Sequence, residues 1–181
     1  NFGFKTGDNE KDIVNNYESI CEVLDTKLED CVLSDQVHKT DIRIVTKEDR
    51  GKGILKERDY KEIDGLVTNE SDITLFTFYA DCVPLFFLDK VNKVIGLAHG
   101  GWRGTVNGIA SKMIDTMTTE YNSKLEDILV AIGPSIGECC YEVGIDVYNE
   151  FDKKLLNTSK ILKPVSDDKW KLNLWEANKT I

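Results

Sequence analysis

The stretch YADCVPLFFLD, residues 79–89, is an apolar and aromatic run typical of a buried strand, yet it contains Asp81 and Cys82. A second apolar run, KVIGLAHGGWRGT at residues 93–105, leads to His99 and then to a pair of glycines. Strand ends that open into loops are where sheet proteins usually build sites. We therefore interpret Cys82 and His99 as two parts of one metal site.

The hydrophobic spacing around these runs predicts one mixed α/β domain. Apolar residues at steps of three and four indicate an amphipathic helix over 12–29 and a second helix from near Val106 to Met117. A further helix begins near Asp146, and the polar, Gly-punctuated segment 47–62 is expected to be an exposed loop. Strands are expected at 31–38, 41–46, 74–80, 83–89, 93–99 and 128–133. The last four runs are strongly apolar, so we expect buried strands in a sheet that is covered on both faces.

Composition limits the class of protein. The chain has 181 residues, 41% hydrophobic content and a formal net charge of −9, and this length allows one domain with a real core. The negative charge disfavours nucleic acid as a partner, because duplex binding neutralises phosphates with Lys and Arg. No apolar run approaches the roughly 20 residues of a membrane span, so we expect a soluble chain without membrane contact. We expect residues 1–181 to form a single domain that lacks parts of both termini.

The cysteines indicate a reducing location. The chain has five of them, an odd number, and Cys139 and Cys140 are adjacent. Adjacent cysteines rarely pair, because a disulfide would strain the peptide between them. Reduced thiols in the cytoplasm fit this pattern better than the disulfide framework of a secreted protein.

The scarcity of histidine points to a metal centre. The chain has only two, His38 and His99, each at the end of an expected strand, and Cys82 also lies at a strand end. Two imidazoles and a thiolate make a three-ligand set with an open fourth position, as a catalytic zinc site requires. The alternative is structural, since a single His at a strand end is usually hydrogen-bonded and a buried Cys usually fills the core.

The neighbouring loops suggest an anion site. In AHGGWRGT, Arg103 offers a fork of donors suited to phosphate or carboxylate, and the helix expected from Val106 adds free N–H groups. Arg103 could instead pair with a structural acid, and Trp102 could pack in the core or stack on a base. The third loop, GPSIGECCYEVG at 133–144, carries Glu142 after its cysteines.

Five motifs carry a resemblance to a known family. QVHKTD, DGLVTN, ADCVPL, AHGGWRGT and GPSIGECCYEVG, in this order, closely resemble the YfiH/YlmD-type family, once labelled laccase-domain or polyphenol oxidase proteins and now described as purine nucleoside phosphorylases. The resemblance runs from NFGFKTGDNE to NLWEAN. It implies an α+β fold, a single layered α/β/α domain with a mixed β-sheet. It also implies a metal held by His38, Cys82 and His99.

The activity implied by the resemblance is cleavage of adenosine, inosine and methylthioadenosine with phosphate, together with deamination of adenosine. Zinc at an open site would lower the pKa of water towards about 7 and supply hydroxide for attack on C6 of adenosine. Asp81 and Glu142 are the candidate proton shuttles, and Arg103 is the candidate phosphate ligand. Purine nucleosides and phosphate are therefore the expected partners.

The laccase label agrees poorly with the residues. A multicopper oxidase needs an imidazole-rich trinuclear cluster, and two histidines cannot build one. His38, Cys82 and His99 do match the ligand set of a blue-copper site, so copper binding in vitro is expected, while metal availability in a cytoplasm favours zinc. Two other hypotheses stay open. One is a Cys–His hydrolase or deamidase with Cys82 as nucleophile and His99 as base, and the other is a non-catalytic metal or nucleotide sensor.

Overall fold

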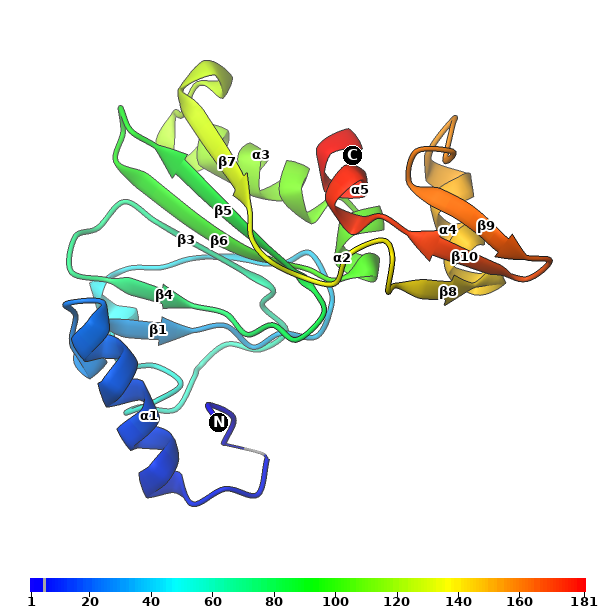
Figure 1. The fold of residues 1–181 in the computed structure, drawn as a ribbon. Helices are drawn as coiled ribbons and strands as arrows, with labels where there is room; N and C mark the ends of the chain where they lie inside the picture. The colour runs from blue at the N-terminus through cyan, green and yellow to red at the C-terminus, as the bar shows by residue number, and fades with distance from the viewer. Residues whose placement is uncertain (5) are drawn as a thin grey trace.

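The run Val83–Asp89 forms strand β5, which lies between β6 and β7 in a five-stranded sheet of order β2-β3-β6-β5-β7. The computed structural model describes residues 1–4 and 6–181 (Figure 1). In this sheet β2 and β3 are parallel, and the other neighbouring pairs are antiparallel. The α+β class and the mixed sheet are therefore confirmed.

The elements follow one another in a simple order. The strands are β1 Cys31–Leu33, β2 Ile42–Ile44, β3 Gly65–Thr68, β4 Thr74–Phe76, β5 Val83–Asp89, β6 Val94–Gly100, β7 Ile128–Ile132, β8 Glu142–Gly144, β9 Leu162–Ser166 and β10 Lys169–Leu172. The α-helices are α1 Glu10–Val23, α2 Trp102–Val106, α3 Ile109–Tyr121, α4 Ile145–Lys154 and α5 Leu174–Thr180, and short 3-10 turns are η1 Leu28–Asp30, η2 Lys47–Asp49 and η3 Leu125–Asp127. Within the described ranges, every helix is too short or too polar to cross a bilayer.

Helix α3 covers one face of the five-stranded sheet. Met113 and Met117 of α3 are fully buried and belong to the same hydrophobic cluster as Phe87 of β5. The helix approaches the sheet closely because Gly96 of β6 has no side chain, and a Cβ there would lie 2.9 Å from Met113 Sδ. This side of the sheet holds the main core.

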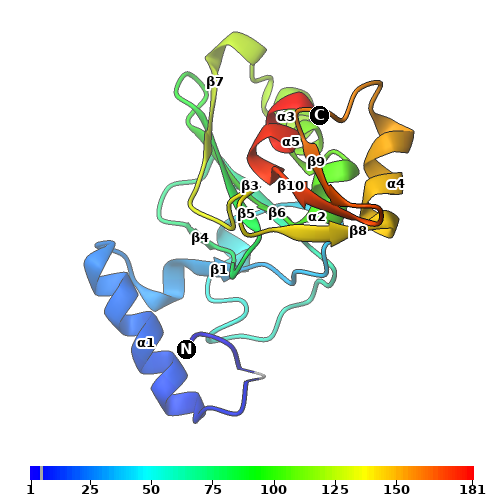
Figure 2. The ribbon, with the colours of Figure 1, turned by 45° about the vertical axis from the view of Figure 1, so that its right-hand side comes forward.

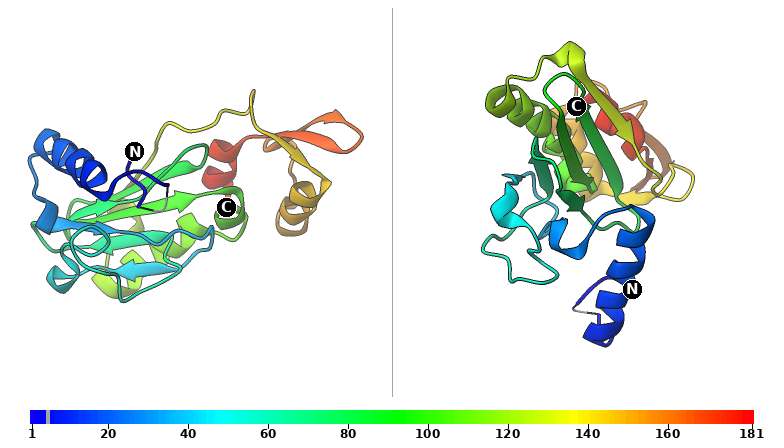
Figure 3. Two further views of the ribbon diagram at one scale, coloured as in Figure 1. Left: turned by 90° about the horizontal axis from the view of Figure 1, so that it is seen from below. Right: turned by 90° about the vertical axis from the view of Figure 1, so that its left-hand side faces the viewer.

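The opposite side carries a second, thinner layer. Strands β1 and β4 pair in parallel, and a cluster that includes Val32 and Leu66 joins β1 to β3 of the large sheet. Helix α1 packs outside β1 and β4 through Ile13 and Tyr17, both fully buried. Helices α1 and α3 therefore lie on opposite sides of the strands (Figure 3).

The expectation of a sheet covered on both faces is wrong for one region. In the strand register, Leu88 lies opposite both Ile95 and Leu129, and Phe86 follows on the same face. These four side chains are each at least 38% exposed, because the β1–β4 layer covers the β3 side of the sheet only. Strand β7 is the last strand of the sheet, and three of its five residues are exposed, although its apolar sequence predicts a buried strand.

Several element boundaries also differ from expectation. Helix α1 ends at Val23 instead of residue 29, and the expected strand 31–38 stops at Leu33. After Leu33 the chain leaves β4, pairs once through Asp35 with Ile63, and then bends at His38, whose backbone is left-handed with φ of +64°. The helix expected from near Val106 begins earlier, as the five-residue α2, and then restarts as α3.

A smaller antiparallel sheet of order β8-β10-β9 lies beside the main body in Figure 1 and comes forward in Figure 2. Helix α4 packs on it, with the ring of Tyr148 stacked 4.5 Å from that of Trp170. Helix α5 joins this unit to α2, because Asn178 Nδ2 donates a hydrogen bond of 3.0 Å to Thr105 Oγ1. The end of β10 is thereby held near the end of β6.

Replacement of Gly96 tests the close packing of α3. Gly96→Ala is expected to lower the free energy of unfolding by about 1–3 kcal/mol, because the new methyl group overpacks a fully filled core. Chemical denaturation measures the loss. Gly137→Ala is the control, since a Cβ there meets only Cys139 Sγ at 3.6 Å. The double variant Gly96→Ala/Met113→Ala tests the cause. If Gly96→Ala lowers the free energy of unfolding by the same amount with and without Met113, the contact with Met113 does not explain the loss.

Candidate metal centre

Strand register brings two of the three predicted ligands together. Strands β5 and β6 are antiparallel, with Val83 opposite Gly100 and Pro84 opposite His99. Cys82 immediately precedes this paired segment, so it lies at the same end of the sheet as His99. The apolar runs on either side fix this register, because a slip by one residue would turn their buried side chains outward.

The third ligand is positioned by a buried carboxylate. Asp64, which immediately precedes β3, accepts backbone N–H groups from Val37, His38 and Lys39 at 3.0, 2.9 and 2.9 Å. The same carboxylate lies 2.9 Å from Nδ1 of His99. One side chain thus holds the loop that carries His38 against the ring of His99.

The ligand atoms of His38, Cys82 and His99 all lie within 4.8 Å of one another. A tetrahedral zinc with bonds of about 2.0–2.3 Å separates its ligand atoms by roughly 3.5 Å, so small rotations of these side chains would close the group on an ion. Gly101 keeps the space open. A Cβ at Gly101 would lie 2.8 Å from His38 Cδ2 and 3.2 Å from Cys82 Sγ. The group can therefore hold a metal ion.

The hydrogen bonds suit the two imidazoles to ligation. Burial alone would lower the pKa of His99, but the Asp64 and Cys82 side chains outweigh it and raise this pKa to about 9. Asp64 occupies Nδ1 and leaves Nε2 for an ion, an arrangement common to metal-binding histidines. Burial, followed by the charges of His99 and Arg103, lowers the pKa of His38 and favours its neutral form. An ion must displace the proton of His99, so its binding is expected to strengthen as pH rises.

A cavity of about 640 Å³ opens beside the three ligands. Phe2, Phe78 and Tyr79 give it aromatic walls, and Gln36 and Asp81 are polar residues of its lining. The Gln36 side chain is held in place, because it donates to the Phe78 carbonyl and accepts from the Phe78 N–H, both at 2.7 Å. This volume falls in the usual range for small-molecule sites, about 300–1,000 Å³.

The three predicted catalytic residues lie in different surroundings. Asp81 lines the cavity next to Cys82. Arg103 is exposed, and its guanidinium lies 4.3 Å from the centre of the Trp102 ring. Glu142 lies on β8 outside the cavity lining, and its carboxylate is 3.6 Å from Lys171 Nζ. The anion site expected here depends on Arg103, because five residues of α2 are too few for an effective helix dipole.

Sequence reasoning missed Asp64 as a residue of the centre. A signal was present, because Asp64 opens the motif DGLVTN at the start of a strand. An acid in front of an apolar strand is common, however, and only the fold shows that it meets the 37–39 loop and His99. The aromatic walls were also missed, since Phe2 and Phe78 come from segments far apart in the chain.

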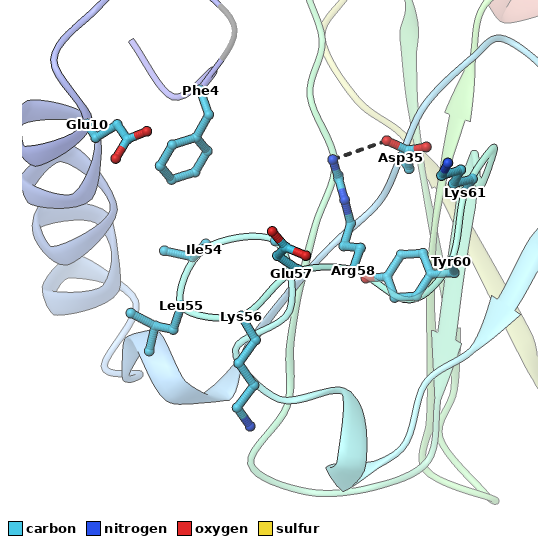
Figure 4. A pocket seen from close by; sticks show the side chains of 11 residues that line it. Phe4, Glu10, Asp35, Ile54, Leu55, Lys56, Glu57, Arg58, Tyr60 and Lys61 are labelled. Atoms are coloured by element: carbon cyan, nitrogen blue, oxygen red, sulfur yellow. Dashed lines mark ion pairs between the residues drawn. The ribbon is translucent and has the colours of Figure 1, made fainter.

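A larger hollow of about 800 Å³ lies elsewhere, over the loop 53–61 (Figure 4). Its lining includes none of the three predicted ligands. Its charged side chains partly neutralise one another, with Arg58 Nη2 3.1 Å from Asp35 Oδ1. The ligand group, and not the size of the hollow, therefore marks the candidate site.

Comparison with known proteins identifies the family. The family model described as multi-copper polyphenol oxidoreductase laccase matches residues 1–181. The chain belongs to this laccase-like family. Among its curated relatives, YlmD of Geobacillus stearothermophilus is 40% identical over 99% of this chain, and YlmD of Bacillus subtilis is 37% identical over 100%. Both are named purine nucleoside phosphorylase, and this chain spans 66% of the length of each.

A solved structure of a similar protein has the same fold. The crystal structure of YfiH from Bacillus licheniformis superposes with a TM-score of 0.94 at 36% identity, over 99% of this chain and 68% of that one. The recognition of a YfiH/YlmD-type protein from five sequence motifs is thereby confirmed.

Removal of the Asp64 charge tests its role in this laccase-like chain. Asp64→Asn is expected to weaken zinc binding by about 10–100-fold, because the partner of His99 Nδ1 is altered and the 37–39 loop loses its anchor. Competition with a chromophoric chelator measures the affinity. Asp41→Asn removes the same charge from an exposed neighbour and is expected to bind zinc normally. Equal affinity in both variants would show that Asp64 does not support the ligands.

Proposed function

We propose that this protein is a zinc-dependent purine nucleoside enzyme that cleaves adenosine, inosine and methylthioadenosine with phosphate and also deaminates adenosine. The observation that carries the proposal is the His38–Cys82–His99 group beside an aromatic cavity of nucleoside size. The names of the two YlmD relatives support the same substrate class.

The lining of the cavity combines aromatic residues with the metal group and a carboxylate, and this combination suits a nucleoside. Phe2 and Phe78 offer ring faces against which a purine can stack. The metal group and Asp81 lie in the same lining, so a base or sugar held there would be within reach of a Lewis acid and a carboxylate. Arg103 is not among the lining residues, but after burial and the charge of His99 its charge also contributes to the lowered pKa of His38, which supports a cation near the metal group.

Zinc is the proposed metal. The residues described hold one His–Cys–His group, and the whole sequence has only two histidines, too few for the trinuclear copper cluster that the family description suggests. Copper would bind this donor set more tightly at equilibrium, so availability decides between the metals. The odd number of cysteines and the adjacent pair Cys139–Cys140 favour a reducing cytoplasm, where we expect zinc to be the more available ion.

Bound zinc would supply Lewis acidity and lower the pKa of water towards about 7. For deamination, the chain must then move protons from water to the departing ammonia at C6. Asp81 is the proposed carrier, because its carboxylate lies in the cavity lining beside Cys82. Glu142 remains the second candidate, but its position on β8 next to Lys171 makes this role less direct.

Phosphorolysis requires a different contribution from the protein, namely the binding and orientation of phosphate. A phosphate oxygen forms a bond to C1′ of the sugar while the bond from C1′ to the base nitrogen breaks, giving ribose 1-phosphate and the protonated base. Arg103 is proposed to orient the phosphate, since its planar fork can hold two oxygens at once. Its stacking on Trp102 limits the directions in which that fork can point.

The first test supplies adenosine and phosphate and looks for the products adenine, ribose 1-phosphate and inosine by chromatography. Protein stripped by a chelator is expected to lose activity and to regain it with zinc. His38→Ala should lose both zinc and turnover, because two remaining ligands hold a divalent ion poorly. Binding of nucleoside with no product in the zinc-loaded protein would instead support a sensor.

A Cys–His hydrolase is the second candidate, favoured by the proximity of Cys82 and His99 that contributes to the raised pKa of that histidine. Iodoacetamide distinguishes the two. A zinc-ligating Cys82 should resist alkylation until the chelator removes the ion. A chelated enzyme that stays fully active until Cys82 is labelled would contradict the zinc mechanism.

The role of Arg103 is tested by a substitution that preserves charge. Arg103→Lys loses the planar fork, so phosphorolysis is expected to fall about 10-fold or more, mainly as a raised KM for phosphate. Deamination of adenosine uses no phosphate and serves as the internal control. Equal losses in the two reactions would assign Arg103 a structural role.

A further inference from the structure

Two exposed thiols lie side by side in the loop between β7 and β8. Cys139 and Cys140 are both exposed, and their sulfur atoms are 3.3 Å apart. The backbone of this turn is ordered, because the N–H groups of Cys140 and Tyr141 both donate to the Gly137 carbonyl, at 3.0 and 3.1 Å. The pair is thus a surface dithiol on a hydrogen-bonded turn.

The chain contains a second thiol pair for comparison. Cys21 of α1 and Cys31 of β1 have sulfur atoms 3.4 Å apart, but both side chains are buried in the core. The two pairs have nearly equal sulfur–sulfur distances but opposite exposure. The buried pair is a packing contact in the core, and the exposed pair is accessible to a ligand. Only Cys139 and Cys140, among the paired thiols of the described residues, are open to a reagent in solution.

The sulfur separation indicates which bridging chemistry the pair can accept. A disulfide needs sulfur atoms about 2.05 Å apart and strains the peptide between adjacent cysteines. Two thiolates on tetrahedral zinc, at about 2.3 Å each, lie roughly 3.8 Å apart. Trivalent arsenic forms bonds to sulfur of similar length that meet near a right angle because of its lone pair. With bonds of about 2.3 Å at that angle, the two sulfurs lie roughly 3.3 Å apart.

We propose that Cys139 and Cys140 form a binding site for trivalent arsenicals, separate from the His38–Cys82–His99 group. With phenylarsine oxide, two arsenic–sulfur bonds form and the arsenic–oxygen bond breaks. The two thiol protons leave with that oxygen as water, and no atom is oxidised or reduced. The second bond closes within one turn, so the adduct gains the advantage of an intramolecular step, about 100-fold or more over a single thiol.

The protonation of the pair agrees with this stoichiometry. The hydrogen bond and charge of Cys139 raise the pKa of Cys140, which disfavours ionisation of both thiols together. Two neutral thiols can supply both protons of the departing water. The loop also contacts the metal-binding segment, since the Ile136 N–H donates to the Asp81 carbonyl at 3.1 Å.

The test treats zinc-loaded protein with phenylarsine oxide and measures intact mass. One phenylarsenic group per chain, with the loss of two hydrogens, is expected. The adduct should survive excess monothiol and be removed by dimercaptopropanol, a dithiol. Peptide mapping should place it on the fragment that contains Cys139 and Cys140.

Variants identify the thiols responsible. Cys139→Ser and Cys140→Ser should each lose the monothiol-resistant adduct, with retention weakened at least 100-fold. Cys21→Ser, assayed with zinc, and Cys82→Ser, compared with native protein without zinc because it lacks a proposed ligand, are the controls and should keep it. Native protein without a monothiol-resistant adduct, or an adduct that persists in both the Cys139 and Cys140 variants, would overturn the proposal. This result is independent of any nucleoside turnover.

Discussion

A buried carboxylate organises the candidate centre. Asp64 is fully buried, and a charge in that position is tolerable only when it is well hydrogen-bonded. It receives three N–H groups from the 37–39 loop and one contact from His99, and together these bonds hold its pKa below the usual range although burial alone would raise it. The same bonds keep His38 in a left-handed backbone, a conformation that costs a non-glycine residue about 1–3 kcal/mol. Asp64 therefore supports the centre in two ways, because it holds the backbone of the 37–39 loop and also contacts the side chain of His99.

The main sheet supplies the rigid frame for that carboxylate. Asp64 immediately precedes β3, and the N–H of His99 donates to the Asp64 carbonyl at 2.8 Å, so the two residues belong to neighbouring strands. Met113 of α3 packs against the same two strands at Gly65 and Gly96. The opposite face is less completely covered, and Phe86, Leu88 and Ile95 remain exposed there. The centre thus lies at one end of β5 and β6, and the opposite ends of the same strands carry exposed apolar side chains on one face.

Much of this could be predicted from the sequence, for identifiable reasons. The two apolar runs fix the β5–β6 register, and register alone brings Cys82 to His99. The scarcity of histidine singled out His38. Asp64 could not be selected from the sequence, because the chain has 32 acidic residues and nothing local to Asp64 shows that it contacts the 37–39 loop. The exposure of Phe86 was hidden for a related reason, since an apolar strand has the same sequence whether or not a layer covers it. The distance of Glu142 from the cavity depends on how the small sheet is attached, which local pattern does not encode.

The three proposed ligands come from segments that are distant in sequence, namely the loop after β1, the residue before β5 and the end of β6. An ion shared by them would act as a reversible cross-link across the fold. In the unfolded chain the same bonds would require the closure of long loops, which carries a large entropic cost. The ion therefore binds the folded state in preference, and its free concentration adds to the free energy of unfolding. Scarcity of the metal would then reduce the lifetime of the protein as well as its turnover, so abundance in the cell would follow metal supply.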